Sequence, residues 1–213
     1  MPKINILLLG DPNCGKTTMA ESIAGVSLSL ETKQAFYPNM IFVAYWFDNQ
    51  GQLLIGPFKK NERCDACSQL KDEGYQNENH ITYNVIIWDF RYNSRDLPTL
   101  RCLCRASNSV LLTYDITNKK SFSNLSKWME ELRRYGKNPD KIIVGTKWDA
   151  PFQSKDYQNA FIHKREISYD QGMKFAQKHD LWFFETSAKI GINNWEVLEM
   201  AINNVINHCE FTF

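Results

Sequence analysis

The sequence lacks the features that mark several large protein classes. It shows no signal-peptide pattern and no apolar run long enough to span a bilayer, so we expect neither secretion nor a membrane span. Its formal net charge is only +1, which gives no reason to expect nucleic acid as a partner. It contains no internal repeat and no Gly/Ser linker. Its 213 residues are enough to bury a proper core, so we predict one cytoplasmic domain over residues 1–213.

Cysteines are few and scattered along the chain, and without a secretion signal we expect them to be reduced. Two of them, Cys64 and Cys67, have the spacing of half a zinc site. No second close pair completes that pattern, because Cys102 and Cys104 are separated by a single residue. We therefore expect an ordinary polar loop at 64–67 and no structural zinc.

What the sequence does contain is a regular alternation of apolar runs and amphipathic stretches, which predicts βαβ units. Apolar or β-rich runs lie at 4–9, 40–47, 53–55, 81–88, 109–115, 141–145 and 181–186, and helical stretches lie at 17–24, from about 121, at 168–178 and from about 194. We predict an α/β fold of three layers, a mostly parallel six-stranded sheet with helices on both faces. The polar region at about 49–80 follows neither period throughout. We interpret it as an insertion between two strands, within which 53–55 can pair back on 40–47.

One stretch between the first strand and the first helix carries chemistry. Residues 10–17 read G-x-x-x-x-G-K-T, the phosphate-binding pattern whose backbone N–H groups surround phosphates at a helix start. The Lys16 side chain can reach the terminal phosphates, and the Thr17 hydroxyl can ligate Mg²⁺. A chance glycine turn in another α/β protein is the alternative. The candidate phosphate-binding residues are Gly10, Asp11, Pro12, Asn13, Cys14, Gly15, Lys16, Thr17 and Thr18.

Two further motifs follow predicted strands, where parallel α/β sheets bind ligands. The first contains Thr146, Lys147 and Asp149. An Asp carboxylate can accept two hydrogen bonds from the ring N–H and the exocyclic amine of guanine, a donor pair that adenine lacks, and the Lys147 stem can lie on the base. The second contains Ser187, Ala188 and Lys189, where a backbone N–H can donate to the guanine carbonyl oxygen. Ordinary surface turns after strands are the alternative.

Three strand-end motifs in this order resemble the Ras superfamily of small GTPases, over nearly the whole chain. The run at 114–122 is similar to Rab proteins, whereas Thr146 and the long connection at 152–165 resemble the septum-promoting GTPases, a Rab-like branch. The resemblance implies a P-loop fold and binding of GTP or GDP with Mg²⁺. It also implies two switch segments that contact effectors and exchange or activating proteins, here 32–45 and 90–100.

By position, the resemblance assigns Mg²⁺ to Thr17, Thr32 and Asp89, and catalysis to Lys16 and Asn93. The second switch departs from the family pattern. Tyr92 stands where the family has a glycine, and Asn93 stands where a glutamine orients the attacking water. Because asparagine is one methylene shorter, we predict a GTPase with slow intrinsic hydrolysis.

Two other functions remain open. A pseudo-GTPase scaffold with little or no hydrolysis fits the altered second switch, whereas a P-loop ATPase or kinase is disfavoured by the motifs at 146–149 and 187–189. Membrane attachment is a separate question. Cys209 lies one position too early for a C-a-a-X prenylation signal at Phe213. We expect a cytoplasmic protein, peripheral on membranes only if a lipidated tail follows Phe213 in a longer chain.

Overall fold

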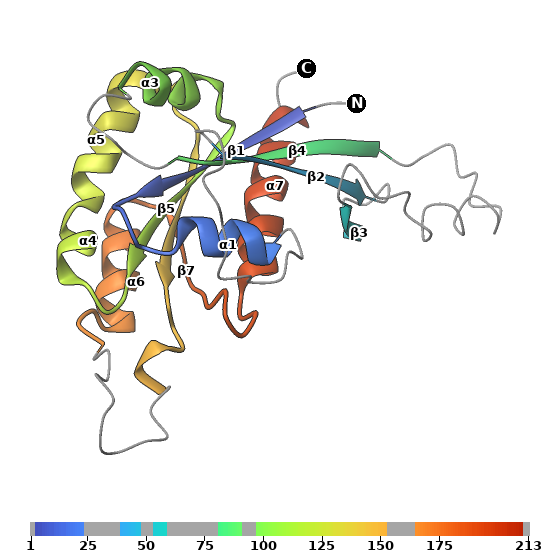
Figure 1. Cartoon of the computed structure of the whole chain (residues 1–213). Helices are drawn as coiled ribbons and strands as arrows, with labels where there is room; N and C mark the ends of the chain where they lie inside the picture. The colour runs from blue at the N-terminus through green and yellow to red at the C-terminus, as the bar shows by residue number, and fades with distance from the viewer. Residues whose placement is uncertain are drawn as a thin grey trace.

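The structure is a computed structural model that describes residues 3–23, 39–47, 53–58, 81–90, 97–152 and 165–210. In order along the chain, its strands and helices are β1 (Lys3–Gly10), α1 (Lys16–Ile23), β2 (Asn39–Phe47), β3 (Leu53–Phe58), β4 (Ile81–Asp89), α3 (Leu97–Ala106), β5 (Ser109–Asp115), α4 (Lys119–Ser123), α5 (Leu125–Tyr135), β6 (Asp140–Thr146), the 3₁₀ helix η2 (Ala150–Phe152), α6 (Tyr169–Lys178), β7 (Trp182–Glu185) and α7 (Asn194–Glu210). From β4 onward each described strand is followed by helix, whereas β2, β3 and β4 follow one another (Figure 1).

The described strands form one sheet in the order β3-β2-β4-β1-β5-β6-β7. Strands β4, β1, β5, β6 and β7 are parallel, and β2 is antiparallel to both β4 and β3. The predicted mostly parallel α/β sheet is confirmed. The predicted strand number of six was wrong, because Leu53–Phe58 forms a seventh strand by pairing with β2 at the edge of the sheet. β3 lies inside the predicted insertion at 49–80, and the other residues of that range lie outside the described part.

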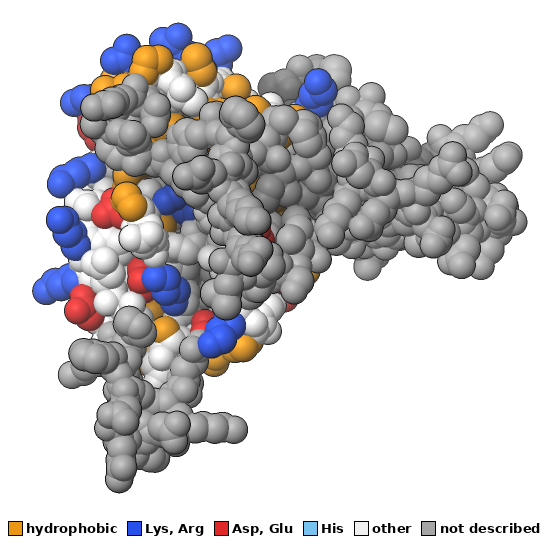
Figure 2. Space-filling view, in the orientation of Figure 1, with side chains coloured by type: hydrophobic (Ala, Val, Ile, Leu, Met, Phe, Trp, Pro, Cys, Tyr) orange, Lys and Arg blue, Asp and Glu red, His pale blue; other side chains and the backbone are white. Residues whose placement is uncertain are grey.

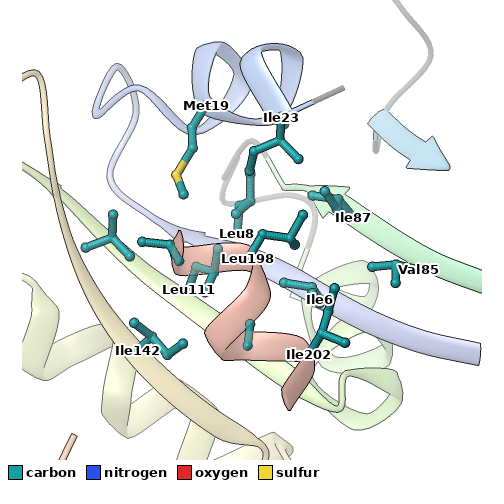
Figure 3. Close-up of a cluster of buried hydrophobic side chains, with 14 of the residues drawn as sticks. Ile6, Leu8, Met19, Ile23, Val85, Ile87, Leu111, Ile142, Leu198 and Ile202 are labelled. Carbon is teal, nitrogen blue, oxygen red and sulfur yellow. The ribbon is translucent and has the colours of Figure 1, made fainter. Parts of the chain in front are cut away.

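Helices cover both faces of the sheet, as predicted, because consecutive side chains of a buried strand point to opposite faces. On one face, Ile6 and Leu8 of β1 pack with Met19 of α1 and Leu198 of α7 (Figure 3). On the other face, Leu7 and Leu9 of the same strand belong to a cluster with residues of α3, α5 and α6. The two clusters bury the central strand β1 between the helices of both faces, and this fixes where the loop after β1 begins.

The helix boundaries are explained by their caps. At the start of α6 the Ser168 hydroxyl accepts from the Gln171 backbone N–H (3.2 Å), and the Gln171 side chain accepts from the Ser168 N–H (2.8 Å), which confirms the predicted helix at 168–178 and its capping box. The helix predicted from about 121 is divided at Asn124 into α4 and α5. Helix α3 was not predicted. It begins at Leu97-Pro98, where proline in the first turn removes no helical hydrogen bond.

Basic side chains gather over α3 and α5 on the surface seen in Figure 2. Arg101 and Arg105 of α3 are exposed, as are Arg133 and Arg134 of α5, which pair with glutamates of their own helix. Exposed ion pairs of this kind contribute little to the stability of the fold. Among the residues that the structure describes, no helix has the length and hydropathy of a membrane-spanning segment.

Candidate nucleotide-binding site

The phosphate loop connects the buried strand β1 to helix α1. At Gly10, a Cβ atom would overlap with the backbone oxygen and the hydroxyl of Thr113 on β5, so only glycine fits there. Asn13 has φ 63°, in the left-handed region that asparagine tolerates better than most residues, and Gly15 has φ 87°. The loop conformation is therefore built into its sequence.

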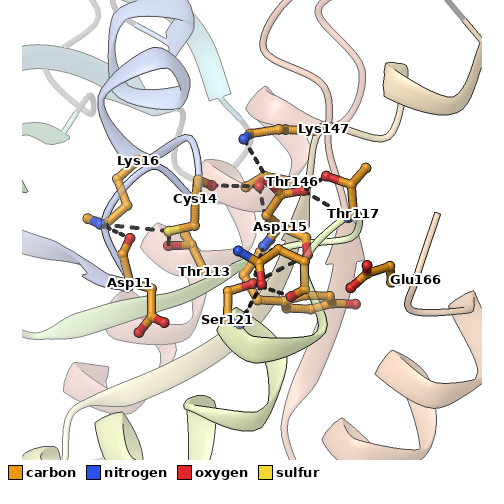
Figure 4. Close-up of polar contacts among 12 residues, drawn as sticks. Asp11, Cys14, Lys16, Thr113, Asp115, Thr117, Ser121, Thr146, Lys147 and Glu166 are labelled. Atoms are coloured by element: carbon orange, nitrogen blue, oxygen red, sulfur yellow. Dashed lines mark hydrogen bonds and ion pairs between the residues drawn. The ribbon is translucent and has the colours of Figure 1, made fainter. Parts of the chain in front are cut away.

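The Lys16 side chain folds back over this loop. Its ammonium group donates to the backbone oxygens of Gly10 (2.9 Å) and Asp11 (2.7 Å), and the residue is buried (Figure 4). The Cys14 thiol lies 3.7 Å from the same ammonium group and 3.1 Å from the Thr113 hydroxyl. Because neutral carbonyl groups hold the ammonium, its positive charge remains at the loop.

Thr17 connects the loop to the end of β4. Its hydroxyl donates to a carboxylate oxygen of Asp89 over 2.6 Å, and Asp89 is fully buried. Two of the three predicted Mg²⁺ ligands are therefore neighbours, although they lie 72 positions apart in the sequence. The third, Thr32, lies outside the described residues. A hydroxyl and a carboxylate supply the oxygen ligands that Mg²⁺ prefers.

Thr146, at the end of β6, ties the second motif to the phosphate loop. Its hydroxyl donates to the backbone oxygen of Cys14 over 2.6 Å and lies 2.9 Å from the backbone oxygen of Tyr114 (Figure 4). The residue is 4% exposed. Next to it, Lys147 has φ 63°, and its ammonium group lies 2.7 Å from a carboxylate oxygen of Asp115 at the end of β5.

Asp149 is held by the third motif. One of its carboxylate oxygens accepts a hydrogen bond from the Ser187 hydroxyl over 2.5 Å, and the side chain is nearly buried. The backbone supports this approach, because the Trp148 N–H donates to the Thr186 oxygen (3.0 Å) and the Thr186 N–H donates to the Gly145 oxygen (2.7 Å). The loops after β6 and β7 are therefore fixed against each other.

These elements surround one cavity of about 270 Å³ at the carboxyl ends of the parallel strands. Seven of the predicted binding residues line it: Gly15, Thr18, Thr146, Lys147, Asp149, Ala188 and Lys189. Sequence reasoning missed three lining residues, Met19, Ala150 and Thr186, although each is adjacent to a predicted residue in the sequence. It also missed Asp115, whose partner Lys147 lies on the neighbouring strand.

The predicted residues of the second switch lie outside the described part of the chain. These are Tyr92 and Asn93, and Asn93 was the second catalytic candidate. Phe90, which directly follows Asp89, is fully buried against the α3 side of the sheet.

The donor set fits a nucleotide with its Mg²⁺. A buried ammonium group faces a glycine loop at a helix start, a hydroxyl and a carboxylate lie side by side, and a second carboxylate borders the cavity that Gly15 of the same loop also lines. No group of three His, Cys, Asp or Glu side chains suited to a metal occurs within the described ranges. The fold and the site define a P-loop nucleotide-binding protein.

Comparisons with known proteins narrow this class. The sequence profile of the Ras family matches residues 74–207. The rice Ras-related protein RGP2 is 34% identical over 125 residues, which cover 58% of this chain and 52% of that protein. Chicken Ras-related protein Rab-8A is 36% identical over 109 residues, 50% of this chain and 47% of that protein. Human Ras-related protein Rab-27B is 29% identical over 211 residues, 97% of this chain and 81% of that protein.

The chain therefore belongs to the Ras family, and it is a Rab-like small GTPase of the Ras superfamily. Members of this family bind GTP or GDP together with Mg²⁺. The matches to RGP2 and Rab-8A span about half the length of those proteins, whereas the match to Rab-27B includes the phosphate loop. The septum-promoting branch stays a prediction.

Proposed function

We propose that this chain is a guanine-nucleotide-binding molecular switch that acts in signalling or vesicle traffic. The observation that carries the proposal is that the buried Asp149 carboxylate and residues Gly15 and Thr18 of the phosphate-binding stretch line the same cavity. A carboxylate at this position matches the two N–H donors at the edge of guanine. The Ser187 hydroxyl bonds to one of its oxygens and so supports its orientation toward the base.

The phosphate loop then binds the diphosphate or triphosphate. Residues 10–18 supply backbone N–H groups, and the Lys16 ammonium adds a buried positive charge. Thr17, Thr32 and Asp89 would hold Mg²⁺, with Asp89 acting through a bound water. The metal ion supplies positive charge that offsets the negative charge of the phosphates.

We further propose that intrinsic hydrolysis is slow. Asn93 would orient the attacking water less well than a glutamine, and Tyr92 restricts a backbone position that a glycine leaves free. Pro12 also removes one N–H from the loop. The same departures favour the second candidate function, a pseudo-GTPase scaffold that binds partners with little or no hydrolysis.

Partners would contact the two switch segments, 32–45 and 90–100, in the manner of effectors and exchange or activating proteins. We assign residues 1–213 to one small-GTPase domain with an insertion at about 49–80, and we propose a cytoplasmic location.

The nucleotide that copurifies with the protein, identified by mass spectrometry, tests the proposal directly. We expect GDP or GTP in the purified protein, and an excess of ATP should not displace it. Single-turnover hydrolysis then separates the two candidates, because a slow but measurable release of phosphate supports the switch, and none supports the scaffold. Protein that binds ATP as well as GTP would contradict guanine recognition.

Replacement of Asp149 tests the site itself. Asp149→Asn should weaken GTP binding and improve binding of xanthosine nucleotides, because an amide can donate to the xanthine oxygen. Ser187→Ala is the matched variant, since it removes the hydrogen bond to this carboxylate and keeps the charge. It should weaken GTP binding without changing base preference. An Asp149→Asn variant with unchanged base preference would remove Asp149 from the site.

A further inference from the structure

The carboxylate of Asp11, inside the phosphate loop, is held by two side chains from the start of α5. One oxygen accepts from the Asn124 amide (2.7 Å), and the other accepts from the Trp128 indole N–H (2.8 Å). Asn124 separates α4 from α5, and Trp128 follows in the first turn of α5. We call these three residues the Asp11 bracket. Neither donor belongs to a nucleotide-binding motif of the sequence.

The bracket directs the Asp11 charge away from the loop. In Figure 4 the Asp11 carboxylate points away from the Lys16 ammonium, which donates to the Asp11 backbone oxygen over 2.7 Å. The backbone and the side chain of Asp11 are therefore held from opposite sides. The positive charge of Lys16 is available to another anion, because the Gly10 and Asp11 oxygens that accept its hydrogen bonds belong to backbone carbonyl groups, which carry no net charge.

The donors of the bracket are rigid. Trp128 is 8% exposed and packs in the core cluster that includes Leu100, Leu125 and Leu132. Its indole N–H therefore has little freedom to follow Asp11 if the loop moves. Pro12, which follows Asp11 in the loop, has no backbone N–H and so cannot donate a backbone hydrogen bond that would hold the loop.

We propose that Asn124 and Trp128 are positioning residues for nucleotide phosphates, which keep an acidic side chain of the phosphate loop turned away from them. The inference rests on the proposed function, because it concerns how the same loop binds phosphate. Phosphates and carboxylates repel each other, so a released Asp11 side chain would oppose binding. The hydrogen bonds from Asn124 and Trp128 hold the Asp11 carboxylate in the orientation that points away from the Lys16 ammonium, where it would not oppose a bound phosphate.

A double-mutant cycle between the carboxylate and the indole tests the bracket. Trp128→Phe removes the N–H donor and keeps an aromatic ring in the core. Asp11→Asn removes the charge and keeps an oxygen acceptor. The matched control is Trp88→Phe, because the Trp88 indole N–H also donates to a side-chain oxygen, that of Asn5 over 3.2 Å, outside the phosphate loop. The measurements are the dissociation rate of a fluorescent GDP analogue and the melting temperature of each variant without nucleotide.

We expect Trp128→Phe to accelerate GDP dissociation at least about tenfold, the effect of losing one hydrogen bond to a charged group. Trp88→Phe should change this rate by less than about twofold. In the double variant, Asp11→Asn should restore the rate to within about threefold of Asp11→Asn alone, because no charge is left to release. If Trp128 had a purely structural role, Trp128→Phe would accelerate GDP dissociation by the same factor with and without the Asp11 charge. A rescue by Asp11→Asn would therefore exclude that role.

Two results would overturn the inference. One is a GDP dissociation rate in Trp128→Phe that equals that of Trp88→Phe. The other is a double variant whose loss is the sum of the two single losses. A wild-type protein that binds no guanine nucleotide would overturn the proposed function itself, so the two failures are distinguishable.

Discussion

The Thr146 hydroxyl is the contact whose removal gives the sharpest test of the site. Thr146→Val keeps the shape of the side chain and removes its only donor. The Cys14 backbone oxygen then loses a 2.6 Å hydrogen bond between two buried residues, since Thr146 is 4% exposed and Cys14 is 1% exposed. A buried acceptor left without its donor costs about 1–3 kcal/mol. We expect Thr146→Val to lower the free energy of unfolding by about 2 kcal/mol, the middle of this range. The Thr146 hydroxyl has one proton for two nearby oxygens, those of Cys14 and Tyr114, so its removal counts as the loss of one hydrogen bond.

For a chain of 213 residues, that loss corresponds to a fall in melting temperature of roughly 4–8 °C. The assay is thermal unfolding followed by circular dichroism, with and without GDP. The loss should be larger with GDP, since the broken contact joins the phosphate loop to the motif that would bind the base.

Thr113→Val provides the comparison. The Thr113 hydroxyl is also buried, but it donates to the Leu9 oxygen over 3.2 Å, a longer and weaker hydrogen bond. We expect Thr113→Val to cost less than Thr146→Val. The reasoning fails if Thr146→Val melts at the wild-type temperature, or if the two variants lose the same stability in both states.

Three further predictions concern catalysis, a buried ion pair and pH. Asn93→Gln should raise the single-turnover rate of GTP hydrolysis, and an unchanged rate would show that the short side chain is not what slows the reaction. Arg165 forms two hydrogen bonds with the buried Glu185 (2.8 and 2.6 Å), so Arg165→Met should cost about 2–3 kcal/mol in urea unfolding, less than a fully buried pair because the guanidinium is partly exposed. The Glu185→Gln/Arg165→Met variant should recover part of that loss. Hydrogen bonds from Arg133 lower the pKa of Glu130 to about 2, so the small contribution of this exposed pair to stability is present above about pH 4.5 and is lost as the pH falls toward 2. The difference in melting temperature between wild type and Glu130→Gln should therefore shrink over that range, and a constant difference would contradict it.

Sequence patterns predicted the strands and the motif loops because both depend on local signals. Buried parallel strands give apolar runs, and a phosphate loop needs glycine at fixed spacing. The end of each parallel strand then falls at one edge of the sheet, so the proximity of Gly10, Asp89 and Thr146 follows from topology.

Contacts that helix residues make with distant parts of the chain were beyond prediction. Nothing near Asn124 in the sequence indicates that its amide bonds to Asp11, 113 positions earlier. The apolar spacing from Phe122 to Leu132 suits one continuous helix, and Asn124 instead separates two. Helix α3 was not predicted. A proline such as Pro98 is typical of a turn, but the first turn of a helix also tolerates it.

The predicted site residues also make hydrogen bonds with each other. The Thr17 hydroxyl bonds to Asp89, the Ser187 hydroxyl bonds to Asp149, and Thr146 bonds to the loop backbone. Each of these contacts joins chain segments that belong to, or follow, two different strands. Because every contact holds a motif in place from another part of the chain, the described part of the candidate site is assembled by the fold itself, and such preorganisation lowers the ordering cost of binding a ligand. The Asp11 bracket extends the same principle one step outward, because its donors lie on a helix rather than at a strand end. Candidate residues for nucleotide binding in this chain can therefore be found in two ways. Some belong to a sequence motif, and others, such as Asn124 and Trp128, make a hydrogen bond that holds a motif in place.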